Sequence, residues 1–237
     1  MLHPPTANSA RISEIFSSLQ GEGTHLGERH LFIRFEECHI HCEYCDELEK
    51  PGKLMTLDEV MAEVVRLDRE EGPHSFVSLT GGEPLLYLPF LKPLMMRLKA
   101  QNFRIYLETN GILWHSLQDC IGWCDVIALD LKPSSVTKEK NFDQDHKRFL
   151  EVAKTKECFA KIILSKEIDV TEFENQIRLV SQAAPQMPVV LVPISSDIEG
   201  HEDADLMELL VHLQRVGLRY VPNIRIVPRF HKILNIR

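Results

Sequence analysis

The chain has 237 residues, 44% of them hydrophobic, and a formal net charge of −8 at pH 7. This content is enough for one domain over residues 1–237, and the negative charge argues against a protein that binds nucleic acid through its phosphates. No apolar run approaches the roughly 18 residues of a membrane span, and no secretory signal opens the chain. The sequence therefore predicts a cytoplasmic protein without nucleic-acid or membrane partners, acting on a small molecule.

Short apolar runs alternate with amphipathic patterns along the chain. The apolar runs read as buried strands over 31–35, 76–79, 105–108, 126–131, 159–164, 189–192 and 224–227. Helices are predicted after a capping box at Thr56 and over 85–99, 143–154, 171–183 and 203–216. Repeated strand–helix units with right-handed crossovers give a parallel sheet with outer helices. We therefore expect an α/β fold, a TIM-like barrel that is either complete or partial.

Cys38, Cys42 and Cys45 form a C-x3-C-x2-C triplet directly after the first predicted strand. Closely spaced cysteines without an evident disulfide partner indicate a soft-metal site. Structural zinc and ordinary iron–sulfur clusters use four ligands, so three cysteines around a four-iron cube would leave one iron open. His39 or His41 could instead add a fourth ligand and complete a closed zinc site. The triplet thus predicts a reactive cluster, with zinc as the alternative.

Polar and glycine-rich sequence follows nearly every predicted strand. Residues 80–84 read TGGEP, 108–111 read ETNG and 130–132 read DLK, while Lys161 lies inside the fifth strand. The carboxyl ends of parallel barrel strands build one catalytic face. We therefore expect a single cup that combines the metal site with these polar groups.

The cysteine triplet, Tyr44 beside its last member and the later 81–84 segment (GGEP) resemble the radical S-adenosylmethionine (SAM) superfamily. The resemblance implies a 4Fe-4S cluster on the three cysteines, with the open iron bound by the amino and carboxylate groups of SAM. It also implies that the GGEP segment binds the amino group. Glycine lets the backbone come close to a ligand, and Glu83 adds an acceptor for an ammonium.

A narrower resemblance runs through most of the chain. Residues 14–23 (EIFSSLQGEG), 108–111 and 231–236 (HKILNI), together with Arg34 and Lys161, are similar to the 7-carboxy-7-deazaguanine synthase family. The family has a partial, modified TIM-like barrel, is usually a homodimer, uses Mg2+ and receives electrons from a flavodoxin-like donor. It converts 6-carboxy-5,6,7,8-tetrahydropterin to 7-carboxy-7-deazaguanine with loss of ammonia, in queuosine biosynthesis.

The resemblance also implies a mechanism, that of a radical carbon–nitrogen lyase. An electron from the cluster cleaves SAM to methionine and a 5′-deoxyadenosyl radical, which removes a hydrogen atom from C6 of the pterin. The ring then contracts and the hydrogen returns, so SAM serves as a cofactor. The cofactors carry the difficult chemistry, and the protein orients them and excludes water.

By motif position, the resemblance assigns residues to three groups. The metal ligands would be Cys38, Cys42 and Cys45 for the cluster and Glu47 for Mg2+. The SAM contacts would be Tyr44, Asp46, Gly82, Glu83, Asp130, Leu131, Lys132, Val192, Pro193, Ile194 and Ser195. The pterin contacts would be Leu19, Gln20, Gly21, Arg34, Thr80, His231 and Arg237. Arg34 could instead form a surface ion pair, and His231 could be a packing residue.

Four positions depart from the family pattern: Glu47, Asp130, Arg229 and Arg237. Glu47 stands where the family has a threonine on Mg2+, and it could bind the ion as a hard anionic ligand or form a salt bridge instead. These changes leave the radical chemistry intact and bear on the substrate. Two other functions remain open, a radical SAM activase acting on a protein and a zinc-stabilised module without catalysis.

Overall fold

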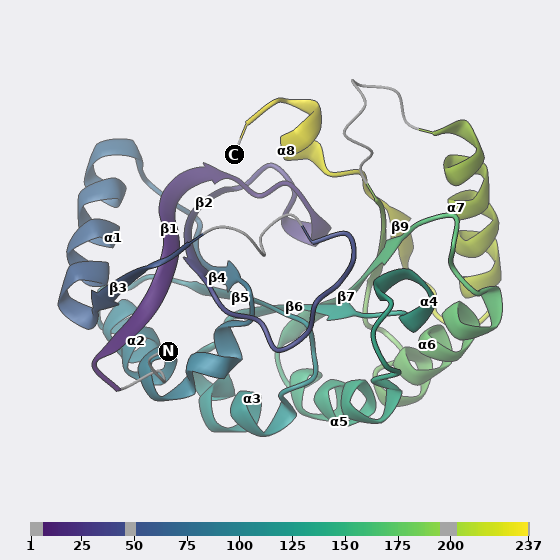
Figure 1. The fold of residues 1–237 in the computed structure, drawn as a ribbon, viewed down its shortest axis with the longest axis horizontal. Helices are drawn as coiled ribbons and strands as arrows, with labels where there is room; N and C mark the ends of the chain where they lie inside the picture. The colour runs from purple at the N-terminus through teal and green to yellow at the C-terminus, as the bar shows by residue number, and fades with distance from the viewer. Residues whose placement is uncertain (1–6, 46–50, 195–202, 237) are drawn as a thin grey trace.

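The computed structural model describes residues 7–45, 51–194 and 203–236. In these residues the central feature is a nine-stranded sheet with the order β3-β1-β2-β4-β5-β6-β7-β8-β9 (Figure 1). The strands are β1 (Ser9–Leu19), β2 (Arg29–Phe35), β3 (Lys53–Thr56), β4 (Phe76–Gly81), β5 (Ile105–Thr109), β6 (Val126–Leu131), β7 (Glu157–Leu164), β8 (Val189–Pro193) and β9 (Ile224–Ile226). Pairing is parallel from β2 through β9 and antiparallel for β1 and β3.

The longer helices, together with α3, follow the strands and lie along the outer side of the curved sheet, whereas the short α4 and α8 do not (Figure 1). They are α1 (Leu57–Glu71), α2 (Leu88–Ala100), α3 (Trp114–Cys120), α4 (Ser134–Thr137), α5 (Asp143–Ala153), α6 (Val170–Ala183), α7 (Ala204–Gly217) and α8 (Phe230–Ile233). Three short 3-10 turns are η1 (Gly23–His25), η2 (Pro84–Tyr87) and η3 (Ile121–Trp123). The two edges of the sheet, β3 and β9, do not pair, so the predicted partial barrel is confirmed.

The seven predicted strands are all present, and the capping box at Thr56 begins α1 as expected. Its hydroxyl accepts a hydrogen bond from the Glu59 backbone N–H, and the Glu59 carboxylate accepts one from the Thr56 backbone N–H. Such a cap contributes about 1 kcal/mol to stability. The sequence prediction missed β1, β3, α3, α4 and α8, and it started α2 too early, because residues 84–87 form the turn η2.

The two faces of the sheet bury different side chains. Outward-facing residues such as Leu79, Leu107 and Leu129 join the large core under the helices. The inward-facing cluster is smaller and consists of Phe76, Tyr106, Val126, Ala128, Phe159, Ile163, Val190 and Val192. This separation follows from the alternation of side chains along a strand.

The amino ends of the parallel strands are closed by η1. The His25 ring packs edge-on against the rings of Phe76 and Tyr106, with centroids 5.1 and 5.6 Å away. Gly23 has φ +78° and a Cβ there would overlap the Phe159 ring, so glycine suits both its backbone and its packing. With this end filled, polar inner residues occur at the opposite, carboxyl end of the sheet.

Among the described residues, no helix is both long and apolar enough to cross a membrane.

Candidate active site

A cavity of about 220 Å³ lies at the carboxyl ends of the inner strands. Strand register brings its polar residues into rows, since Arg34 of β2 is opposite Thr80 of β4 and Asp130 of β6 is opposite Lys161 of β7. The predicted site residues that line the cavity are Leu19, Gln20, Gly21, Arg34, Cys38, Cys42, Tyr44, Cys45, Thr80, Gly82, Asp130, Lys132 and His231. One cavity therefore gathers most of the predicted cluster, SAM and pterin residues.

Other predicted residues lie elsewhere. Leu131 and Val192 are fully buried in the outer and inner cores, and Pro193 is buried as well. Ile194 is partly buried and packs against both cores. A SAM contact from this group would use backbone atoms, and it stays a prediction. Four predicted residues lie outside the described residues: Asp46, Glu47, Ser195 and Arg237.

The cysteine loop leaves β2 and forms one wall of the cavity. Cys42 and Ile40 are buried with Ile112 and Phe142, and this small cluster supports the loop. Burial raises the pKa of Cys38 to about 11 and also raises that of Cys42. Thiolates in such a place require a nearby positive charge, which a bound metal provides.

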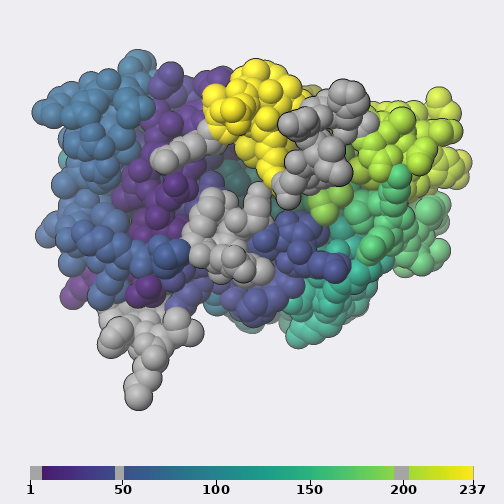
Figure 2. Space-filling view, turned by 45° about the horizontal axis from the view of Figure 1, so that its top comes forward, coloured from purple at the N-terminus to yellow at the C-terminus, as the bar shows by residue number. Residues whose placement is uncertain are grey.

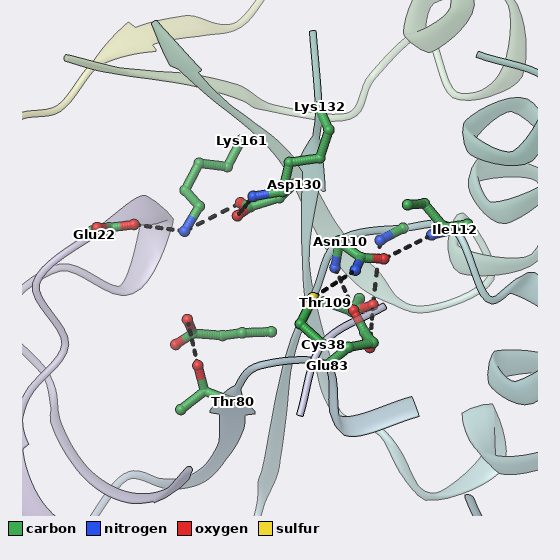
Figure 3. Close-up of polar contacts among 12 residues, drawn as sticks. Glu22, Cys38, Thr80, Glu83, Thr109, Asn110, Ile112, Asp130, Lys132 and Lys161 are labelled. Carbon is green, nitrogen blue, oxygen red and sulfur yellow. Dashed lines mark hydrogen bonds and ion pairs between the residues drawn. The ribbon is translucent and has the colours of Figure 1, made fainter. Parts of the chain in front are cut away.

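The arrangement of the cysteines fits a cluster. Among the described residues, no three His, Cys, Asp or Glu side chains converge closely enough to hold a single metal ion. In a four-iron cube, by contrast, each thiolate binds a different iron. Cys38, Cys42 and Cys45 all line this cavity, where each could bind one iron of such a cube. The amide Nδ2 of Asn110 lies 3.8 Å from Cys38 Sγ, close enough to donate to the sulfur (Figure 3).

Glu83 is completely buried beneath the cavity. Its carboxylate accepts hydrogen bonds from the Thr109 hydroxyl at 2.9 Å, the Asn110 backbone N–H at 2.8 Å and the Leu85 backbone N–H at 3.0 Å (Figure 3). Burial raises its pKa to about 7. Here Glu83 ties the GGEP turn to the end of β5, and its predicted contact with the SAM amino group stays a prediction.

The glycines of this turn permit close packing of the chain on itself. A Cβ on Gly82 would overlap the carbonyl of Glu37, and one on Gly81, where φ is +109°, would overlap the backbone of Phe35. The Gly82 N–H donates to the Phe35 carbonyl at 2.8 Å, and the Glu83 N–H donates to the Glu37 carbonyl at 2.7 Å. These contacts hold the turn against the segment that leads into the cysteine loop.

At the other end of the cavity, Glu108 accepts two hydrogen bonds from neutral groups. The Gln20 amide donates to one carboxylate oxygen at 3.0 Å, and the Thr80 hydroxyl donates to the other at 3.2 Å. Burial raises the pKa of Glu108. The Gln20 oxygen in turn accepts from the Glu22 backbone N–H at 3.1 Å, so the loop after β1 is fixed against β5.

Arg34 lies on an aromatic floor rather than on the outer surface. Its guanidinium is 5.4 Å from the centroid of the Phe16 ring, which stacks on Phe32 with centroids 5.0 Å apart. Its side chain is 19% exposed, and its Nε is 3.7 Å from Glu14 Oε2. Arg34 thus pairs with Glu14, as the ion-pair alternative expects, and it also lines the cavity; its contact with the pterin stays a prediction.

A chain of opposite charges crosses the floor of the cavity. Lys161 Nζ lies 2.6 Å from Glu22 Oε2 and 3.1 Å from Asp130 Oδ1, and Lys132 Nζ lies 3.0 Å from Asp130 Oδ2 (Figure 3). Arg229 Nε lies 3.3 Å from the other Glu22 oxygen. Burial disfavours the charge of Glu22, but Lys161 and Arg229 outweigh it and hold its pKa at about 2. Alternating charge is what allows these buried groups to stay ionised.

This chain of charges reaches the cysteine wall through Lys132. Its ammonium lies 5.7 Å from the centroid of the Tyr44 ring, next to the last cysteine. Burial raises the pKa of Tyr44 to about 12, so this phenol is neutral near pH 7. Asp130, one of the positions that depart from the family pattern, joins Lys132 to Lys161 through its carboxylate.

Comparison with known proteins shows the family to which this chain belongs. The model of the Radical SAM superfamily matches residues 32–162. The 7-carboxy-7-deazaguanine synthase of Geobacter sulfurreducens is 32% identical, over 95% of this chain and 97% of the relative. That of Methanopyrus kandleri is also 32% identical, over 94% and 93%. The chain belongs to the 7-carboxy-7-deazaguanine synthase family of radical SAM enzymes.

Solved structures share the fold of this family member. QueE from Escherichia coli superposes with a TM-score of 0.63 over 94% of this chain and 95% of that chain, at 19% identity. SuiB of Streptococcus suis bound to S-adenosylmethionine gives 0.61 over 84% and 50%, at 16% identity. At these identities the likeness concerns the fold alone.

Several cavity residues of this synthase-family chain were not assigned a role from sequence: Glu22, Glu36, Glu108, Thr109, Asn110, Lys161 and Arg229. Glu22, residues 108–111 and Lys161 belong to segments that match the family, which was the available signal. Their pairing could not be foreseen, since Glu22 and Lys161 are 139 positions apart. Glu36 pairs with Arg11 from β1, a strand that the sequence prediction missed.

Proposed function

We propose that this protein is a 7-carboxy-7-deazaguanine synthase that acts in the cytoplasm. It would convert 6-carboxy-5,6,7,8-tetrahydropterin to 7-carboxy-7-deazaguanine with loss of ammonia, for queuosine biosynthesis. The observation that carries the proposal is the shared cavity, which the three cysteines line together with Gln20, Arg34, Thr80 and Glu108. Both relatives are named 7-carboxy-7-deazaguanine synthase, and this chain matches 97% and 93% of their length.

Cys38, Cys42 and Cys45 would hold the 4Fe-4S cluster, with SAM between them and the strand ends. When bound, this pair supplies a carbon radical that can remove a hydrogen atom from the substrate. The protein excludes water and orients the reactants: Gly82 exposes backbone, while Tyr44 and Lys132 border the SAM side. Lys132 offers a cation for a carboxylate in this region.

The second end of the cavity suits a flat pterin that carries a carboxylate. Arg34 presents a planar cation for the carboxylate. One edge of a pterin bears N–H groups, and the buried carboxylate of Glu108 is an acceptor for them. Phe16 and Phe32 provide an aromatic wall beside Arg34. These groups support a ring substrate of this chemical class.

Mg2+, the electron donor and the assembly state extend the proposal. Glu47 would bind Mg2+ in place of a hydroxyl ligand, because a carboxylate oxygen is a preferred ligand of this ion. Glu47→Ala should then raise the Mg2+ concentration needed for half-maximal turnover, and an unchanged Mg2+ titration would remove this role. A flavodoxin-like protein would deliver the electron, and the enzyme would be a homodimer.

Product analysis tests the proposal. Anaerobically reconstituted enzyme with reductant, SAM and the carboxypterin is expected to form the deazapurine acid, detected by mass spectrometry. Formation of 5′-deoxyadenosine without consumption of the pterin would refute the substrate while leaving radical chemistry in place.

Arg34→Ala separates this function from that of a protein-activating radical enzyme. The variant should lose pterin turnover and keep SAM binding, because Arg34 lies at the pterin end of the cavity. An activase would not depend on this arginine for a small carboxylate.

A further inference from the structure

The C-terminal segment after β9 crosses the pterin end of the cavity. It is anchored at its start, where the Val227 N–H donates to the Leu191 carbonyl at 2.9 Å. Further on, the Phe230 N–H donates to the Gly21 carbonyl at 2.9 Å. Figure 1 places α8 on the open side of the sheet, and Figure 2 shows yellow C-terminal residues beside purple N-terminal ones. Both Arg229 and His231 line the cavity from this segment.

The segment also packs directly on the loop that follows β1. A Cβ on Gly21 would overlap the His231 ring, so the ring lies against the glycine backbone. This contact fixes the distance between His231 and the Gln20–Glu22 loop. The loop in turn is held to β5 by the hydrogen bond from Gln20 to Glu108.

Arg229 adds a charged connection between the same two segments. Its side chain is only 8% exposed, and its Nε is 3.3 Å from Glu22 Oε1. Glu22 uses its other oxygen for Lys161 at 2.6 Å, so the carboxylate cannot move toward solvent without leaving a buried cation. The two residues that follow Arg229 are those that touch Gly21. An arginine held here therefore sets the position of His231.

We propose that Arg229 is a positioning residue for the pterin, acting through Glu22. By holding the C-terminal segment on the Gln20–Glu22 loop, it keeps His231 at the pterin end of the cavity and sets the affinity for the substrate. The inference rests on the proposed function, whose substrate it uses.

Steady-state kinetics with the carboxypterin tests the inference. Arg229→Met is expected to raise KM by about tenfold or more and to leave kcat within about twofold, because a buried charged contact is removed outside the reacting atoms. Arg229→Lys should give an intermediate KM, since it keeps the charge without the planar fork. The matched control is Arg225→Met, which removes an exposed arginine of β9 that binds Asn223.

A second readout follows the segment itself. Amide hydrogen exchange of residues 227–236 in the reconstituted holoenzyme should become faster in Arg229→Met and stay unchanged in Arg225→Met. A KM within about twofold of wild type in Arg229→Met, or an equal rise in Arg225→Met, would overturn the inference. If Arg229→Met fails to fold, Arg229→Lys decides by the same two readouts. Absence of pterin turnover in the wild type would instead refute the proposed function. The hydrogen-exchange comparison would then still test whether Arg229 holds the C-terminal segment in place.

Discussion

Replacing Lys161 with methionine should lower the free energy of unfolding by about 3 kcal/mol. Lys161 lies between Glu22 and Asp130, its side chain is 9% exposed, and its removal leaves two partly buried carboxylates without their shared cation. Breaking a buried ion pair by deleting one partner costs about 3–5 kcal/mol. Arg229 and Lys132 still hold the two carboxylates from their outer sides, so we expect the lower end of this range.

The pKa of Glu22 gives a second route to the same magnitude. Burial works against its charge, yet Lys161 and Arg229 hold its pKa at about 2, compared with 4.5 for an ordinary glutamate. This difference corresponds to about 3 kcal/mol of stability. Because the pKa is lowered by folding, the contribution is complete above pH 4.5 and is lost as the pH falls toward 2. Lys161→Met should therefore weaken the acid dependence in this range.

Denaturant unfolding followed by circular dichroism, at pH 7 and at pH 3, measures both effects under anaerobic, reducing conditions. The control is Lys147→Met, which removes an exposed lysine of α5 and should change stability by less than about 0.5 kcal/mol. Equal stability of Lys161→Met and Lys147→Met at pH 7 would refute the reasoning, since it would mean that the chain of charges contributes nothing to the fold.

Two further predictions concern glycine packing and acid stability. Gly21→Ala would place a methyl group against the His231 ring and should lower kcat/KM for the pterin by about a hundredfold. Gly122→Ala, with open space around it, should not, and equal kcat/KM values would contradict the packing. Burial lowers the pKa of His30 to about 3, so the wild type should lose stability as the pH falls below 6.5. His30→Leu should flatten this slope between pH 6.5 and 4.5 by up to about 1.4 kcal/mol per pH unit, and an unaltered slope in urea titrations would exclude the effect.

The sequence predicted the parallel part of the fold because its strands are continuous apolar runs buried on both faces. It missed β1, in which polar and apolar residues alternate irregularly, and β3, which is only four residues long and largely exposed. These two strands pair antiparallel at one edge, where one-sided burial leaves a weaker signal.

The sequence motifs predicted which residues gather at the site, but they did not predict which side chains contact one another there. The cysteine triplet and the Gln20 and Arg34 segments meet in one cavity as expected. The SAM contact of Glu83 stays a prediction, and nothing in the sequence indicated that its carboxylate accepts hydrogen bonds from Thr109 and Asn110. The link from Arg229 through Glu22 to Lys161 joins three distant segments, and only the folded chain reveals it.

The central claim is that three cysteines hold a four-iron cluster with one open iron in this cavity. Iron and acid-labile sulfide analysis of anaerobically reconstituted protein, with electron paramagnetic resonance before and after SAM addition, tests it most directly. We expect about four irons and four sulfides per chain and a spectrum of the reduced cluster that changes when SAM binds. Stoichiometric zinc without sulfide, or a spectrum of the reduced cluster that stays the same after SAM addition, would contradict the account.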